Sequence, residues 1–290
     1  MDITTEPFQW TVPRTPGEPG AERLLRGKVV RPHGGADGER LPHIVILHGF
    51  KGFMDWGFFP ELARRIAERG LAAVLFNMSG SGIGEDPLEF TDVEGFAKNT
   101  HSRELDDVAC VRARLRSGEL AGIDPDRACL LGHSRGGGTA LIHAADDGGY
   151  AGVVTWAALD DFDRYDEATK DLWRAEGEIW IPNARTGQPH RMDLDLLTDL
   201  EQNRSRLDIR AACSRLSTPT LLVHGTADAS VTPDALDRLS AALPQGVGQT
   251  LVIDGAGHTF GAGHPFGSPT PEWDTAVAAT LDHVSGALGL

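Results

Sequence analysis

Short apolar runs that alternate with amphipathic segments constrain the fold of this chain more than any other feature. The first of them is HIVILHG, over residues 43–49. An uninterrupted run of this length is typical of a strand that is buried on both faces. Five similar runs follow, at residues 71–77, 128–133, 152–158, 220–225 and 250–255.

Helical patterns separate these runs. The first has Phe59, Leu62 and Ile66 on one face and ends at Gly70. Further helical patterns cover residues 101–118, 135–145 and 232–243, and the last carries Trp273, Val277, Leu281 and Val284. Two shorter strands are predicted before the first run, at residues 8–12 and 24–30. This alternation predicts the α/β class, with a mostly parallel central sheet and helices on both of its faces.

One segment breaks the alternation. Residues 160–217 contain no buried strand, but they include two polar helical stretches and two tryptophans, Trp173 and Trp180. We therefore expect a core of residues 1–159 and 218–290, with residues 160–217 inserted as a cap or lid. Trp173 and Trp180 are candidate walls of a substrate pocket, because indoles bury much apolar ligand surface. The alternative is a surface excursion without a role in any site.

The charge balance excludes some partners. The net charge of −15 argues against sequence-independent binding to nucleic acid and against attraction to anionic lipid. No stretch reaches 18 apolar residues, and the first ten residues do not read as a signal peptide, so we expect a cytoplasmic protein without a membrane partner. Three scattered cysteines provide neither a disulfide framework nor a zinc site, and we expect no metal or other cofactor.

The stretch LLGHSRGGG places Ser134 in a G-x-S-x-G pattern between Gly132 and Gly136. This pattern also occurs in ordinary glycine-rich turns, so its context decides. Here a buried strand precedes it and a helix follows at Arg135, which is the setting of a nucleophile elbow. The two glycines fit that setting, because side chains there would collide with the strand or the helix. Ser134 is therefore the candidate nucleophile.

The acid and the base should follow on loops after later strands. Asp228 comes three residues after the run that ends at Gly225, and His258 follows the next run. At one edge of a parallel sheet, His258 would accept the proton of Ser134 and Asp228 would orient the ring of His258. Four other carboxylates are rival acids: Asp160, Asp161, Asp234 and Asp254.

The oxyanion of an acyl-transfer reaction needs two amide donors. One should be the backbone of Arg135, directly after the nucleophile, and the other the backbone of Phe50 in LHGFKGF, with Lys51 as its alternative. His48 could be mistaken for a base, but we expect it to bond within its own loop.

Four motifs in order, LHGF, GHSRGG, HGTADASV and GAGHTF, resemble those of the α/β-hydrolase superfamily. Within it, HGFKGFMDWGFFPELA and GHSRGGG look closest to small bacterial esterases of the cinnamoyl-esterase and dienelactone-hydrolase-like kind. The resemblance implies an α/β-hydrolase fold and a triad of Ser134, Asp228 and His258, with the amides of Phe50 and Arg135 as oxyanion donors. The dienelactone hydrolases proper have a cysteine at the position of Ser134.

The predicted function is therefore a cofactor-free serine carboxylesterase that takes a small-molecule ester as its substrate and cleaves it through an acyl-enzyme on Ser134; the sequence does not predict an oligomeric state. One alternative keeps the triad but takes an amide, a peptide or a thioester as acyl donor. Another is a non-catalytic binding protein on a hydrolase scaffold, because a fold alone does not fix a function.

Overall fold

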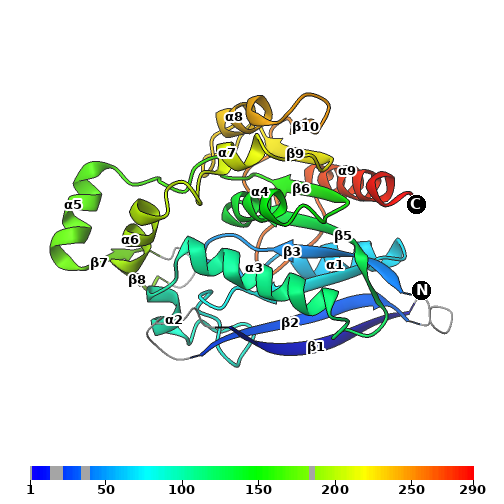
Figure 1. The fold of residues 1–290 in the computed structure, drawn as a ribbon, viewed down its shortest axis with the longest axis horizontal. Coiled ribbons are helices and arrows are strands. Elements are labelled where there is room, and N and C mark those ends of the chain that lie inside the picture. The colour runs from blue at the N-terminus through cyan, green and yellow to red at the C-terminus, as the bar shows by residue number, and fades with distance from the viewer. Residues whose placement is uncertain (1, 14–21, 34–39, 183–186) are drawn as a thin grey trace.

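The framework of the protein is an eight-stranded sheet. A computed structural model describes residues 2–13, 22–33, 40–182 and 187–290. The strands of the sheet are β1 (Ile3–Val12), β2 (Arg23–Pro32), β3 (Leu41–Leu47), β4 (Ala72–Asn77), β5 (Ile123–His133), β6 (Gly152–Trp156), β9 (Thr220–Gly225) and β10 (Gly248–Ile253). They lie in the order β1-β2-β4-β3-β5-β6-β9-β10 (Figure 1). The six strands from β4 to β10 in that order are parallel, whereas β1 and β2 are antiparallel additions at one edge.

The six apolar runs of the sequence are these six parallel strands, so the predicted α/β architecture is confirmed. Every residue of β4, β6 and β9 is buried, which explains why their sequences show no polar alternation. Parallel strands all end at the same edge of a sheet, and the loops after β3, β5, β9 and β10 therefore meet there.

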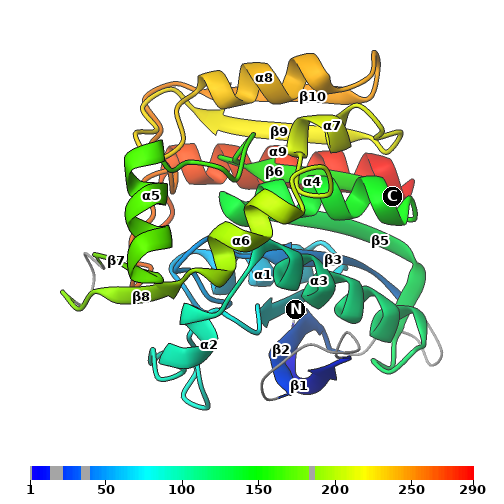
Figure 2. The ribbon, with the colours of Figure 1, turned by 60° about the vertical axis from the view of Figure 1, so that its left-hand side comes forward.

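Helices cover both faces of the sheet (Figures 1 and 2). One face is covered by α3 (His101–Arg116), α4 (Arg135–Asp147), α7 (Ile209–Cys213) and α8 (Asp234–Ala242). The other face is covered by α1 (Phe59–Glu68) and α9 (Pro271–Leu288). The predicted inward residues of α1, namely Phe59, Leu62 and Ile66, are all buried. None of the helices in the described ranges has the length and apolar character needed to cross a bilayer.

The segment between β6 and β9 has two parts. The first comprises α5 (Glu167–Glu176), a hairpin of β7 (Glu178–Ile181) and β8 (His190–Asp193), and α6 (Asp195–Gln202). This part, at the left of Figure 1, has a small core of its own, which also takes in Phe96 of α2 (Val93–Ala97). We call the residues from α5 to α6 the projecting part. The second part ends in α7, which packs on the main core. The structure thus divides the predicted insertion of residues 160–217, and only α5 to α6 project from the body of the molecule.

Candidate active site

Ser134 lies at a sharp turn between β5 and α4. Its backbone is left-handed, with φ 57° and ψ −120°, an uncommon conformation for a residue with a side chain. The flanking glycines are required by space. A Cβ on Gly132 would lie 2.1 Å from the carbonyl oxygen of Gly136, and a Cβ on Gly136 would lie 2.5 Å from that of His48. The predicted need for glycine on both sides of Ser134 is therefore confirmed.

Asp228 and His258 come together at the same edge of the sheet, after β9 and β10. Nδ1 of His258 donates to Oδ2 of Asp228 at 2.8 Å, a tautomer assigned from the carboxylate it faces. The other oxygen, Oδ1, accepts the amides of Ser230 and Val231 at 2.8 and 3.0 Å. Burial alone would raise the pKa of Asp228, but hydrogen bonds from His224, His258 and the Val231 amide hold that pKa well below its usual range. The carboxylate is thus ionised and oriented toward His258.

The rival carboxylates interact elsewhere. Their partners are Arg238 for both Asp160 and Asp234, Arg210 at 3.6 Å for Asp161, and the hydroxyl of Thr226 at 3.0 Å for Asp254. Among the candidate acids, Asp228 is the one that bonds to His258.

Two histidines support this arrangement in ways that the sequence did not indicate. His224 is the second-last residue of β9. Its Nε2 lies 3.4 Å from Oδ2 of Asp228 and donates to the Val231 carbonyl at 2.9 Å. Nε2 of His133 donates to the carbonyl of His258 at 2.9 Å. Burial lowers the pKa of His133 to about 3, so its ring is neutral. His133 thereby joins the strand end that carries Ser134 to the loop that carries His258.

The loop after β3 lies against the nucleophile. A Cβ on Gly49 would lie 2.9 Å from Cβ of Ser134. His48 fixes this loop, because its Nδ1 donates to the carbonyl of Gly49 at 2.9 Å and its Nε2 accepts the amide of Met78 at 3.0 Å. The expected structural role of His48 is confirmed. The loop continues directly into Phe50, the candidate oxyanion donor.

The two candidate donors are also joined through their side chains. The guanidinium of Arg135 stacks 3.9 Å from the centre of the Phe50 ring, and it forms an ion pair with Glu104 at 3.2 Å. Both members of that pair are buried. Within the described ranges, the backbone amides of Phe50 and Arg135 donate to no protein acceptor. Two amides next to Ser134 are thus held in place and free to bind an oxygen.

A pocket of about 350 Å³ opens beside Ser134. Its other described lining residues are Phe50, Lys51, His101, Arg135, Leu159, Phe162, Arg164, Tyr165, Ile181 and Pro182. Tyr165 and Ile181 also line an outer hollow of about 550 Å³ on the projecting part. Neither of the predicted pocket tryptophans is among the described residues that line the Ser134 pocket. Trp180 is 58% exposed and lines the outer hollow.

Trp173 lies inside the projecting part. Its side chain is fully buried, and its indole N–H donates to the carbonyl of Met192 at 3.1 Å. This placement differs from the predicted pocket wall, because the apolar face of α5 is directed toward its own small core and leaves Trp173 no surface for a ligand.

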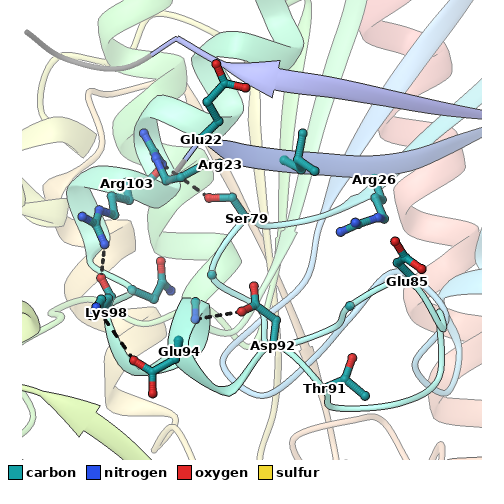
Figure 3. A pocket seen from close by; sticks show the side chains of 15 residues that line it. Glu22, Arg23, Arg26, Ser79, Glu85, Thr91, Asp92, Glu94, Lys98 and Arg103 are labelled. Atoms are coloured by element: carbon teal, nitrogen blue, oxygen red, sulfur yellow. Dashed lines mark hydrogen bonds and ion pairs between the residues drawn. The ribbon is translucent and has the colours of Figure 1, made fainter. Parts of the chain in front are cut away.

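A separate cavity, of about 530 Å³, lies between the edge of the sheet and α2 (Figure 3). Its lining includes four acidic and four basic side chains: Glu22, Glu85, Asp92, Glu94, Arg23, Arg26, Lys98 and Arg103. Within the described ranges, no three His, Cys, Asp or Glu side chains are grouped as a metal site would require.

The comparisons with known proteins agree with this architecture. The model of the prolyl oligopeptidase family matches residues 56–282. The 2,6-dihydropseudooxynicotine hydrolase of Paenarthrobacter nicotinovorans is 23% identical over 190 residues, which are 64% of this chain and 44% of that relative, less than half its length. Est1E from Butyrivibrio proteoclasticus, solved with ferulic acid, matches with a TM-score of 0.67 at 17% identity over 92% of this chain and 96% of that one. A monoacylglycerol lipase from Paleococcus ferrophilus matches with a TM-score of 0.65 at 15% identity over 99% of this chain and 100% of that one. These likenesses confirm the fold expected from the four motifs.

Proposed function

The chain belongs to the prolyl oligopeptidase family of α/β hydrolases, and on that premise we propose that it cleaves carboxylic esters through an acyl-enzyme on Ser134. The observation that carries the proposal is the 2.8 Å hydrogen bond between Asp228 and His258, at the sheet edge where Ser134 has its strained backbone. An ionised acid, an oriented imidazole and a hydroxyl on an elbow are the parts that nucleophilic acyl transfer requires.

The reaction proceeds in two halves. In the first, Oγ of Ser134 attacks the ester carbonyl while Nε2 of His258 takes the hydroxyl proton. The oxyanion is stabilised by the amides of Phe50 and Arg135, and Asp228 stabilises the imidazolium. The protonated His258 then gives its proton to the departing alcohol. In the second half, His258 takes a proton from water, the hydroxide attacks the acyl-enzyme, and the acid leaves as Ser134 regains its proton.

The acyl donor has two candidates. Est1E, solved with ferulic acid, and the monoacylglycerol lipase support esters. The family model, described as that of prolyl oligopeptidases, supports amides as the second candidate. The two differ in the leaving group alone, so matched esters and anilides of the same acids separate them.

The test is labelling with a fluorophosphonate probe, followed by hydrolysis of 4-nitrophenyl esters and the matching 4-nitroanilides. We expect Ser134→Ala to abolish labelling and to lower kcat by several orders of magnitude, on the order of 10⁶ in a well-studied serine hydrolase. Ser214→Ala is the control. It removes an exposed hydroxyl that donates to the carbonyl of Ala211, so it should leave labelling and kcat unchanged. Labelling that persists in Ser134→Ala would refute the nucleophile. Faster hydrolysis of the anilides would transfer the proposal to amides.

A further inference from the structure

The pocket beside Ser134 carries positive charge, although the chain as a whole carries −15. Three of its eleven described lining residues are cations, namely Lys51, Arg135 and Arg164, and none of the eleven is Asp or Glu. The three come from separate parts of the fold: the loop after β3, the start of α4 and the segment after β6. The fold therefore brings cations together here from distant positions in the sequence.

Lys51 and Arg164 are not neutralised by the described residues. Nζ of Lys51 donates to the carbonyl of Pro182 at 3.1 Å, and Nη2 of Arg164 donates to the carbonyl of Ser230 at 2.5 Å. A carbonyl orients a cation but does not cancel its charge. Burial lowers the pKa of Lys51, and the charge of Arg135 lowers it further. An anion in the pocket would relieve that repulsion.

Four acidic residues around this pocket are each paired with a cation. Asp160, Asp161 and Asp163 share a neighbouring hollow with Arg164, and Glu104 lies behind Arg135. Their pairs are Asp160 with Arg238 at 2.5 Å, Asp161 with Arg210 at 3.6 Å, Asp163 with Lys170 at 2.7 Å and Glu104 with Arg135 at 3.2 Å. Glu104 thus offsets Arg135, and the charges of Lys51 and Arg164 remain for a ligand.

The one histidine among the described lining residues of this pocket is uncharged. The ring of His101 lines the pocket, is almost completely buried and stacks on Phe162 with the ring centres 4.1 Å apart. Its Nδ1 has no hydrogen-bond partner among the described residues. Burial, with a smaller contribution from Arg135, holds the pKa of His101 well below its usual range, so the ring is neutral. His101 therefore adds no charge to the pocket, and among the described lining residues Lys51 and Arg164 remain the two unpaired cations.

The pocket lies on the acyl side of Ser134. Both candidate oxyanion donors, Phe50 and Arg135, belong to its lining. His258, which must stay beside the departing alcohol to protonate it, is a described residue that lies outside this lining. The part of the substrate that enters the pocket is therefore the acyl chain.

Charge of one sign is not a general property of the cavities of this chain. In the cavity of Figure 3, four acidic and four basic side chains balance, and Glu94 pairs there with Lys98 at 3.8 Å. We propose, resting on the hydrolase function above, that the Ser134 pocket selects esters whose acyl chain ends in a carboxylate, which are half-esters of dicarboxylic acids. Lys51 and Arg164 bind the distal carboxylate.

The test compares substrates of equal size. The monoethyl esters of succinic, glutaric and adipic acids are each paired with the ester in which a carboxamide replaces the free carboxylate, and the released ethanol is measured. At the best chain length we expect kcat/KM to be at least about tenfold higher for the carboxylate, since charge-assisted hydrogen bonds are about twice as strong as neutral ones. A ratio near one at every length would overturn the proposal.

Variants assign that preference to residues. Lys51→Met and Arg164→Gln should each lower the carboxylate-to-carboxamide ratio about fivefold, the size of a partly exposed ion pair. Arg69→Gln is the matched control. Arg69 lies at the C-terminal end of α1, at the opposite edge of the sheet, so its loss should change the ratio less than about twofold. Unchanged ratios in both pocket variants would overturn the proposal.

A binding measurement separates this proposal from the catalytic one. Calorimetry of Ser134→Ala with monoethyl adipate and with its carboxamide partner does not depend on turnover. Tighter binding of the carboxylate, weakened by Arg164→Gln in the same background, supports the anion pocket even if no ester is cleaved. Cleavage of neutral esters with no preference in binding would leave the hydrolase standing and refute the anion pocket.

Discussion

Replacing Asp228 by asparagine exchanges one carboxylate oxygen for an NH₂ group at nearly constant volume. The surroundings decide which way the new side chain lies. Oδ1 accepts the amides of Ser230 and Val231 at 2.8 and 3.0 Å, so the asparagine oxygen must stay there. The reverse orientation would point its NH₂ group at two N–H donors and lose both bonds, at about 1–3 kcal/mol each. The NH₂ group therefore faces Nδ1 of His258, 2.8 Å from the replaced atom.

That orientation forces His258 into the other neutral tautomer. An NH₂ donor needs an acceptor, so Nδ1 of His258 must give up its proton and Nε2 must carry it. Nε2 then cannot accept the proton of Ser134. In a well-studied serine protease the same exchange lowers kcat by about 10⁴-fold. We expect a loss of that order here, which corresponds to about 5.4 kcal/mol of transition-state stabilisation.

The assay is kcat/KM for 4-nitrophenyl butyrate, with the rate of fluorophosphonate labelling as a second measure. Asp254→Asn is the control, because Asp254 also follows a strand but bonds to Thr226 instead of His258. Thermal unfolding of both variants checks that they are folded. A folded Asp228→Asn protein that keeps more than about a tenth of the wild-type activity would show that Asp228 does not set the tautomer of His258.

Other replacements test the framework around the site. Gly136→Ala should lower the free energy of unfolding by about 1–3 kcal/mol in urea titrations, because its Cβ would lie 2.5 Å from a backbone oxygen that cannot move away; Gly286→Ala, in a helix with open space around it, should not. Trp173→Ala should cost about 3–5 kcal/mol, since the indole fills the core of the projecting part, and a thermal midpoint like that of the wild type would contradict this packing role. Trp180→Ala should change stability by less than about 1 kcal/mol and alter the ranking of long against short acyl esters, and uniform slowing of the series would exclude a contact with the acyl chain. The folded-state pKa of Asp228 is depressed, so the wild type should be more stable than Asp228→Asn at neutral pH. This difference in the free energy of unfolding should shrink as the pH falls below about 4, where an unfolded aspartate takes up its proton. A difference that grows on acidification would contradict this sign.

The sequence predicts the parts of this fold that local pattern controls. The buried strands appear as continuous apolar runs. The two glycines beside Ser134 can be recognised as part of an elbow because backbone atoms leave no room for a side chain at either position. Asp228 could be favoured over its rivals from motif order alone. That Asp160 and Asp161 pair with distant arginines is a matter of tertiary contact, which no pattern in the sequence records.

The remainder depends on distant contacts. The strands β7 and β8 have four residues each, and the helix α2 has five. Such short elements do not show a recognisable hydrophobic periodicity in the sequence. Trp173 and Trp180 look alike in the sequence, and only the packing of α5 separates the buried indole from the exposed one. The positive pocket was likewise not predictable, because Lys51 and Arg164 lie far apart in the chain and their unneutralised charge depends on where each neighbouring acid finds its partner.

The positions of the proposed triad along the chain set the moment at which the proposed activity can first appear. Ser134 directly follows β5, whereas His258 follows the last strand of the sheet, 124 residues later. At about 5–20 residues per second, a ribosome needs roughly 6–25 s to make the intervening chain. Throughout that interval the elbow can already be formed on the nascent core, yet His258 is not available to take the proton of Ser134. On the proposed mechanism the newborn chain cannot hydrolyse an ester until β10 has docked, and the first appearance of activity during synthesis would report the docking of its last strand.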